Sequence, residues 1–144
     1  MIHLTAATLV ACCCAHAVLA ADAPESAMRW SPSSTTAVSI TGPITLSRTS
    51  LTAYGATFPL RLTADVAAFG SDDGPRPAQV YAVTRPTNPP LLNRNQLCGP
   101  DPATWLVTVA RAPDQLELIA STGAAPPTSK EAPDVCGIFY YDRR

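Results

Sequence analysis

Phe58-Pro-Leu-Arg-Leu-Thr-Ala-Asp-Val66 is the stretch that decides the fold, because its side chains alternate between two kinds without a break. The first, third, fifth, seventh and ninth residues are apolar, and the residues between them are Pro59, Arg61, Thr63 and Asp65. A period of two is typical of a β-strand with one buried and one wet face. The sequence therefore predicts a strand over 58–66, and the proline at its second position indicates that it begins at an edge or a bulge.

Shorter segments of the same kind surround this strand, separated by turn residues such as Gly42-Pro43 and Ala112-Pro-Asp114. No stretch of ten residues shows a clear helical period, so we expect little helix. These patterns predict an all-β domain, a small antiparallel meander of about eight short strands that either closes into a barrel or folds into a sandwich. The shorter predicted strands cover residues 37–41, 44–47, 51–54, 79–84, 104–111, 115–121 and 137–141.

The inward positions of these strands supply one modest core. Such a core competes for side chains with any large enclosed ligand cavity, so we expect at most a shallow cleft. The predicted core consists of Val38, Ile40, Ile44, Leu46, Leu51, Phe58, Leu60, Leu62, Val66, Val80, Trp105, Val107, Val109, Leu116, Leu118, Ile138 and Tyr140.

The first twenty residues contain no Asp, Glu, Lys or Arg and hold a short apolar run that ends in Val18-Leu-Ala20. This pattern indicates a secretory signal peptide that is removed, which predicts a periplasmic or secreted protein without a transmembrane helix in the mature chain. Leu9-Val-Ala-Cys12 also has the form of a bacterial lipobox, and lipidation of Cys12 would instead anchor the protein to a membrane. We expect a Ser/Pro-rich flexible leader over 21–36, where Met28 and Trp30 either pack on the domain or form part of a tether, and one β domain over 37–144.

The composition excludes several kinds of chemistry. The formal net charge of -1 gives no broad attraction to nucleic acid. Both histidines lie in the first twenty residues, so the mature chain has no His nucleophile system, His general base or His-ligated metal. The acidic turn Gly70-Ser-Asp-Asp-Gly74 has only two adjacent carboxylates and lacks the register of a calcium loop. We therefore expect no catalysis, no cofactor and no metal.

Cys98 and Cys136 are the two thiols left after the first twenty residues, and an even pair in an exported protein predicts a disulfide. This bond would staple the Pro-rich loop over 85–102 to the last strand. A rigid polar loop suits recognition, because little ordering entropy is lost on binding. Alternatively, its Asn side chains satisfy the loop's own backbone. The candidate binding residues are Arg85, Asn88, Asn93, Arg94, Asn95 and Gln96.

The segment Val83-Thr-Arg-Pro-Thr-Asn-Pro-Pro-Leu-Leu-Asn-Arg-Asn-Gln-Leu-Cys-Gly99 resembles a group of small exported proteobacterial proteins that share a Leu-Leu-Asn-x-Asn-x-Leu-Cys-Gly element. The resemblance implies a shared fold and the paired cysteines, and it transfers no catalytic residue. In size, export and β build the chain is also loosely similar to periplasmic lysozyme inhibitors, without a shared inhibitory motif.

Together these observations predict a non-catalytic binding protein of the bacterial envelope that recognises a protein or a glycan through the 85–102 loop. Two alternatives remain open. The loop could inhibit a hydrolase such as lysozyme, or the chain could be a membrane-anchored structural lipoprotein.

Overall fold

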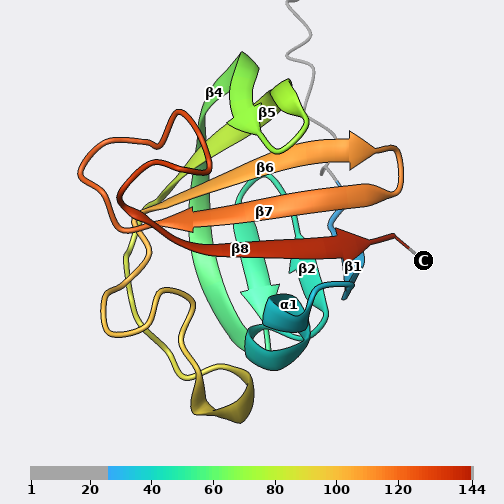
Figure 1. Ribbon diagram of the computed structural model, residues 1–144. Coiled ribbons are helices and arrows are strands. Elements are labelled where there is room, and N and C mark those ends of the chain that lie inside the picture. Colours follow the sequence, from blue (N-terminus) through green and yellow to red (C-terminus); the bar gives the residue numbers. More distant parts are fainter. Residues whose placement is uncertain (1–25, 144) are drawn as a thin grey trace, which may run out of the picture.

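The computed structural model describes residues 26–143, in which the β-strands follow one another around a closed barrel (Figure 1). A short helix, α1 (Thr35–Ile40), and a 3-10 turn, η1 (Leu92–Arg94), interrupt the strands. The expected signal segment over 1–20, with Cys12, lies outside the described residues. The strands are β1 (Met28–Pro32), β2 (Ile44–Leu46), β3 (Ser50–Ala53), β4 (Ala56–Ser71), β5 (Gly74–Val83), β6 (Trp105–Ala112), β7 (Gln115–Ser121) and β8 (Val135–Asp142).

Every strand pairs antiparallel with the next one along the chain, and β8 returns to β1 through the pairs Ser31↔Asp142 and Pro32↔Tyr141. The second half of β4 extends beyond β3 and pairs with β5 alone. The prediction of an all-β antiparallel meander is confirmed, and the fold is a barrel rather than a sandwich. The described residues include no helix of sufficient length and apolarity to cross a membrane.

The first strand lies in the segment that was expected to be a flexible leader. Met28 and Trp30 pair with Leu46 and Ile44 of β2, so the leader prediction over 21–36 is wrong for residues 28–32. Met28-Arg-Trp30 does alternate apolar and polar side chains, but three residues are too few to reveal a period of two. β1 is essential to the barrel because it joins β2 to β8.

The strand predicted over 37–41 is wrong, because most of these residues form α1. Ser34 caps the helix: its Oγ accepts a hydrogen bond from the Ala37 backbone N–H at 3.1 Å. The helix ends before Gly42, whose positive φ of 60° is a conformation that favours glycine. Val38, predicted to lie in the core, is 52% exposed on this helix.

The connection expected over 67–77 is replaced by a long hairpin. β4 continues to Ser71 and β5 starts at Gly74, so only Asp72 and Asp73 lie between the two strands. In Figure 1 the tip of this hairpin projects beyond the other strands at the top of the barrel.

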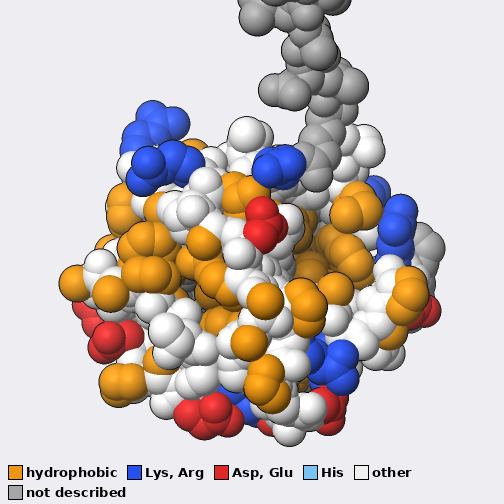
Figure 2. All heavy atoms as spheres, turned by 90° about the horizontal axis from the view of Figure 1, so that it is seen from above, with side chains coloured by type: hydrophobic (Ala, Val, Ile, Leu, Met, Phe, Trp, Pro, Cys, Tyr) orange, Lys and Arg blue, Asp and Glu red, His pale blue; other side chains and the backbone are white. Residues whose placement is uncertain are grey.

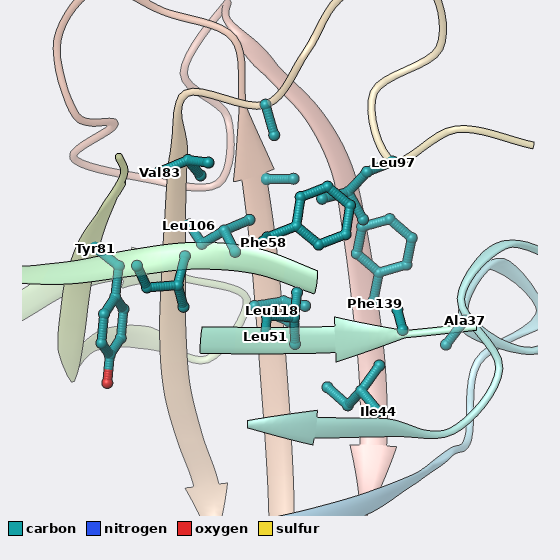
Figure 3. Close-up of a cluster of buried hydrophobic side chains, with 14 of the residues drawn as sticks. Ala37, Ile44, Leu51, Phe58, Tyr81, Val83, Leu97, Leu106, Leu118 and Phe139 are labelled. Atoms are coloured by element: carbon teal, nitrogen blue, oxygen red, sulfur yellow. The ribbon is translucent and has the colours of Figure 1, made fainter. Parts of the chain in front are cut away.

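The barrel interior holds the main hydrophobic core at the end that α1 and the 84–104 loop close (Figure 3). Ala37 from the helix and Leu97 from the loop are both buried in it. Burial also raises the pKa of the Tyr141 hydroxyl, which forms a hydrogen bond with Thr41 Oγ1 at 2.6 Å. The members of this inner core include Trp30, Ile44, Leu51, Phe58, Leu60, Tyr81, Leu106, Leu118, Phe139 and Tyr141.

A second, outer core lies on the other face of the sheet, and it corrects the prediction of one core. The end of β4 and the 122–134 loop lie side by side here, because Gly70 N–H donates to Thr128 O and Lys130 N–H donates to Gly70 O. Glu117 is fully buried on this same face and accepts hydrogen bonds from Ser71 Oγ and Tyr140 Oη. The outer core contains Phe69, Ala78, Val80, Val107, Val109 and Ile119, with Val66, Trp105, Val135 and Ile138 packed against it.

The predicted disulfide between Cys98 and Cys136 is confirmed, and it links the 84–104 loop to β8. The loop is also held by its own apolar side chains, because Leu91 and Leu97 are buried in the inner core. The segment is therefore stapled covalently and packed at the same end of the barrel.

Candidate functional site

The end of the barrel away from the packed core contains a pocket of about 670 Å³. Its walls come from the start of β1, the end of β2 and the facing halves of β4 to β7, with one residue after β8. Ligands of small β-barrels bind in their mouths. The lining residues are Met28, Trp30, Leu46, Asp65, Val66, Ala67, Pro77, Ala78, Gln79, Thr108, Ala110, Ala112, Pro113, Gln115, Leu116 and Arg143.

Small side chains on β6 leave this end of the barrel unfilled. Alternate residues of a strand face the interior, and on β6 they decrease in size from Leu106 to Thr108 to Ala110. Leu106 is in the inner core, whereas Thr108 and Ala110 line the pocket. The pocket is open to solvent and not an enclosed cavity, and it is present because part of the predicted core lies outside the barrel and does not fill it.

Trp30 separates the pocket from the packed core. It belongs to the inner core, lines the pocket and is only 7% exposed. Its indole N–H is buried and has no hydrogen-bond partner among the described residues. A buried donor without a partner costs free energy, and this nitrogen is too deeply buried for a ligand in the pocket to reach it.

A β-bulge at Thr63 brings Asp65 into this site. Leu62 pairs with Tyr81, but the next pairs are Ala64↔Val80 and Asp65↔Gln79, so Thr63 is an extra residue in the ladder. The Thr63 hydroxyl donates to Val80 O at 2.9 Å. Asp65 consequently shares the inward face with Leu62.

The bulge corrects the alternation on which the strand prediction relied. Phe58, Leu60 and Leu62 pack in or against the inner core as expected, but Val66 packs against the outer core. Asp65 is exposed to solvent, as expected, but it lies on the inward face at the mouth of the barrel and lines the pocket. The strand itself is confirmed, and the assignment of its faces is wrong beyond Leu62.

A short chain of hydrogen bonds orients the polar side of the pocket. Tyr81 Oη donates to Gln79 Oε1 at 2.8 Å, and Gln79 Nε2 donates to Asp65 Oδ1 at 3.0 Å. Tyr81 is buried, and Figure 3 shows its hydroxyl pointing away from the labelled side chains of the inner core. A carboxylate only accepts, so the amide nitrogen of Gln79 faces Asp65 and the amide oxygen accepts from Tyr81.

Only two charged side chains are among the described residues that line the pocket, Asp65 and Arg143. Arg143 follows β8, and its backbone N–H donates to Asp114 O at 2.7 Å, which holds it beside the turn between β6 and β7. Figure 2, seen from the side of the β4–β5 hairpin tip, shows hydrophobic side chains over much of this face and charged side chains mostly toward its edges. The pocket is therefore mainly apolar, with one acidic and one basic group.

The predicted loop residues lie at the other end of the molecule, where the amide nitrogens of four of them donate to backbone carbonyls. Asn93 and Asn95 both donate to Ser39 O, at 3.1 and 3.0 Å, and so fasten the loop to α1. Asn88 donates to Gly99 O, and Gln96 donates to Asn88 O. The contacts of Asn88 and Gln96 agree with the alternative in which the amides satisfy the loop's own backbone, whereas those of Asn93 and Asn95 satisfy the backbone of α1.

Arg85 and Arg94 are the exposed cations of this loop. Arg94 and Asn93 have positive φ values of 61° and 55°, which non-glycine residues rarely adopt. The strained turn holds Arg94 on the surface. Recognition through this loop, and inhibition of a hydrolase by it, stay predictions.

The acidic turn of the β4–β5 hairpin pairs with cations of the protein. Asp72 forms an ion pair with Lys130, and Asp73 lies 3.2 Å from both Arg76 and Arg111. The hydrogen bond from Arg111 holds the pKa of Asp73 below its usual value. Among residues 26–143, no group of three or more His, Cys, Asp or Glu side chains could hold a metal ion.

Sequence reasoning missed the pocket because its signals were short or misleading. Trp30 stood in a segment interpreted as a leader, and Asp65 was assigned to the wet face. The alanines at 110 and 112 on β6 were the one usable signal, since small inward residues leave space in a barrel.

The structure leaves the resemblance to small exported proteobacterial proteins as a prediction. The barrel, the disulfide and the pocket are properties of this chain's own residues. No protein-family model, no curated protein and no solved structure matches the chain.

Proposed function

We propose that this chain is a non-catalytic binding protein that holds a small, largely apolar molecule in the open end of its barrel. The observation that carries the proposal is the pocket of about 670 Å³ beside a packed core. This volume lies in the range of roughly 300–1,000 Å³ that is usual for sites of drug-sized ligands. Apolar walls with a few polar groups are also usual for such sites.

The walls of the pocket favour binding without large rearrangement. Each strand of the closed barrel pairs with two neighbours along part of its length, and Trp30 at the base of the pocket is held in the inner core. A preformed site loses little conformational entropy when it binds a ligand. The geometry therefore supports reversible binding of a ligand that enters from solvent.

The residues around the pocket support the non-catalytic part of the proposal. Asp65 is the one carboxylate among the described lining residues, whereas glycoside hydrolysis uses two. Gln79, Thr108 and Gln115 are polar groups of the lining that position ligands and do not exchange protons near neutral pH.

Export to the periplasm or the medium is also part of the proposal. Disulfides persist in oxidising compartments, and the Cys98–Cys136 bond supports such a location. The signal-like sequence over 1–20 supports the same conclusion. Intact mass of the protein from its native envelope fraction distinguishes a chain that starts at Ala21 from one lipidated at Cys12.

The binding test uses N-phenylnaphthylamine, an uncharged fluorescent probe that is excited by energy transfer from tryptophan. The chain has two tryptophans, Trp30 and Trp105. In the variant Trp105→Phe, energy transfer to the probe therefore comes from Trp30, which lines the pocket. We expect saturable energy transfer from Trp30 to the bound probe. We expect Ala110→Phe, which fills the space beside Leu116, to weaken probe binding by about tenfold or more.

Ala124→Phe is the matched control, because it makes the same change at an exposed position of the 122–134 loop. It should leave probe binding unchanged. No saturable binding, or equal binding by the two alanine variants, would overturn the proposed site. A thermal melt of each variant verifies that the barrel is folded.

A further inference from the structure

We infer that the pocket selects an uncharged hydrophobic alcohol over a fatty-acid-like carboxylate, and that Asp65 determines this preference. The inference rests on the proposed function, because it names the ligand class of the same pocket. It is carried by the bulge at Thr63, which puts a carboxylate on the inward face of the barrel.

Asp65 is oriented as a hydrogen-bond acceptor for a ligand. Its Oδ1 accepts from Gln79 Nε2, and Tyr81 holds Gln79 in that orientation. Its Oδ2 accepts no hydrogen bond from the described side chains of the pocket wall. An ionised carboxylate only accepts, so the group it binds must donate.

A hydroxyl group suits the acceptor on the pocket wall. It can donate a hydrogen bond to Asp65 without carrying a charge into the apolar part of the pocket. A ligand carboxylate could only accept, and it would lie near a like charge at Asp65. An ammonium group could donate to Asp65, but its charge would have to leave water for apolar walls.

Arg143 would favour the opposite preference, for a ligand carboxylate. It lines the same pocket and could pair with a carboxylate at the rim. Asp65, however, is fixed by the hydrogen bond from Gln79, whereas no side-chain hydrogen bond to a described residue fixes the Arg143 guanidinium. The ordered group is therefore the one to which we assign selectivity.

The test is displacement of N-phenylnaphthylamine by three molecules with the same chain: octanol, octanoate and octylammonium. At neutral pH we expect octanol to displace the probe at the lowest concentration, and octanoate to need about tenfold more. Asp65→Asn removes the charge at constant shape and should reduce this difference to less than about threefold. Asp101→Asn, which removes a carboxylate outside the pocket lining, is the matched control and should keep the full difference.

Each outcome separates the inference from the proposed function. If the probe does not bind, the proposed function itself fails. If the probe binds but octanoate or octylammonium displaces it better than octanol, the alcohol class is wrong and the binding function stands. An octanol-to-octanoate ratio that is the same in the wild type and in Asp65→Asn would overturn the role of Asp65.

Discussion

Gln79 lies directly opposite Asp65 across β4 and β5, and its side-chain amide donates to Asp65 Oδ1 at 3.0 Å in the mouth of the barrel. The pairing depends on one extra residue. In a regular ladder Ala64 would oppose Gln79, and Asp65 would face outward with Val66 directed inward. The bulge at Thr63 thus brings a carboxylate to the inward face at the mouth of the barrel, and bulges are known to redirect side chains in this way beside functional sites.

The first prediction concerns the hydrogen bond that holds this bulge. Thr63→Val removes the donor to Val80 O while it keeps the β-branched shape. We expect the free energy of unfolding to fall by about 1 kcal/mol, because one intramolecular hydrogen bond is lost and Val80 O must find another donor. Urea unfolding measures the change.

Thr87→Val is the control, because Thr87 is exposed in the 84–104 loop. It should change the free energy of unfolding by less than about 0.5 kcal/mol. Equal effects of the two substitutions would show that the hydroxyl of Thr63 does not hold the bulge.

Most of the strand content could be predicted from the sequence because alternation depends on side-chain chemistry over several residues. The strands near 44–47, 104–111 and 115–121 are present close to their expected bounds, whereas the strand expected over 79–84 begins five residues earlier, at Gly74. Which residues of β4 beyond Leu62 face the barrel interior could not be predicted. Apolar and polar residues alternate strictly in the sequence only because the extra residue Thr63 is counted as part of the pattern. Only the pairing partner on β5 reveals that one residue is extra.

The candidate site was less predictable than the fold because it depends on contacts between distant segments. Met28 and Trp30 belong to a short strand that pairs with β2 and β8, both of which come later in the chain. Their role in the pocket therefore had no local signal. Val107 and Val109 were correctly expected to be buried, but burial in an outer core looks the same in the sequence as burial inside a barrel.

The second prediction concerns the disulfide. Reduction of Cys98–Cys136 opens a closed loop of 38 residues and should lower the free energy of unfolding by about 4 kcal/mol in the loop-entropy model. Denaturant unfolding with and without reductant measures the difference. The double variant Cys98→Ser/Cys136→Ser should match the reduced protein and be insensitive to reductant. Coincident curves for oxidised and reduced protein would contradict the prediction.

The third prediction concerns the pH dependence of the hairpin tip. Arg111 lowers the pKa of Asp73 in the folded protein, so the ionised form is favoured on folding. The stabilisation is present above the unfolded value of about 3.8 and is lost as the pH falls through the lower folded pKa. Asp73→Asn should therefore be less stable than the wild type near neutral pH, and the difference should shrink as the solution is acidified below that range.

Urea unfolding of both proteins as a function of pH tests this dependence. Because Asp73 is exposed, added salt should also reduce the difference near neutral pH. A difference between the two proteins that is independent of pH would show that the carboxylate charge is not responsible.

The fourth prediction compares a side chain that ties the 84–104 loop to α1 with one that is exposed on the loop surface. Asn95→Ala removes the donor to Ser39 O and should lower the free energy of unfolding by about 1 kcal/mol, because the loop loses a tie to α1. Arg94→Ala removes an exposed side chain and should change it by less than about 0.5 kcal/mol. Urea unfolding compares the two, and a larger loss for Arg94→Ala would reverse this assignment.

The fifth prediction tests recognition by the loop independently of stability. Arg85→Ala/Arg94→Ala keeps the amides that tie the loop to the fold, so it removes surface charge without loosening the loop. If the loop recognises an envelope protein or a glycan, the immobilised double variant should lose the specific partner that the wild type captures from periplasmic extract or peptidoglycan. It should still bind the fluorescent probe in the barrel.

Capture that is equal for both proteins would exclude these two cations from recognition. Loss of probe binding as well would show that the substitution damaged the barrel, since the loop and the pocket lie at opposite ends of it.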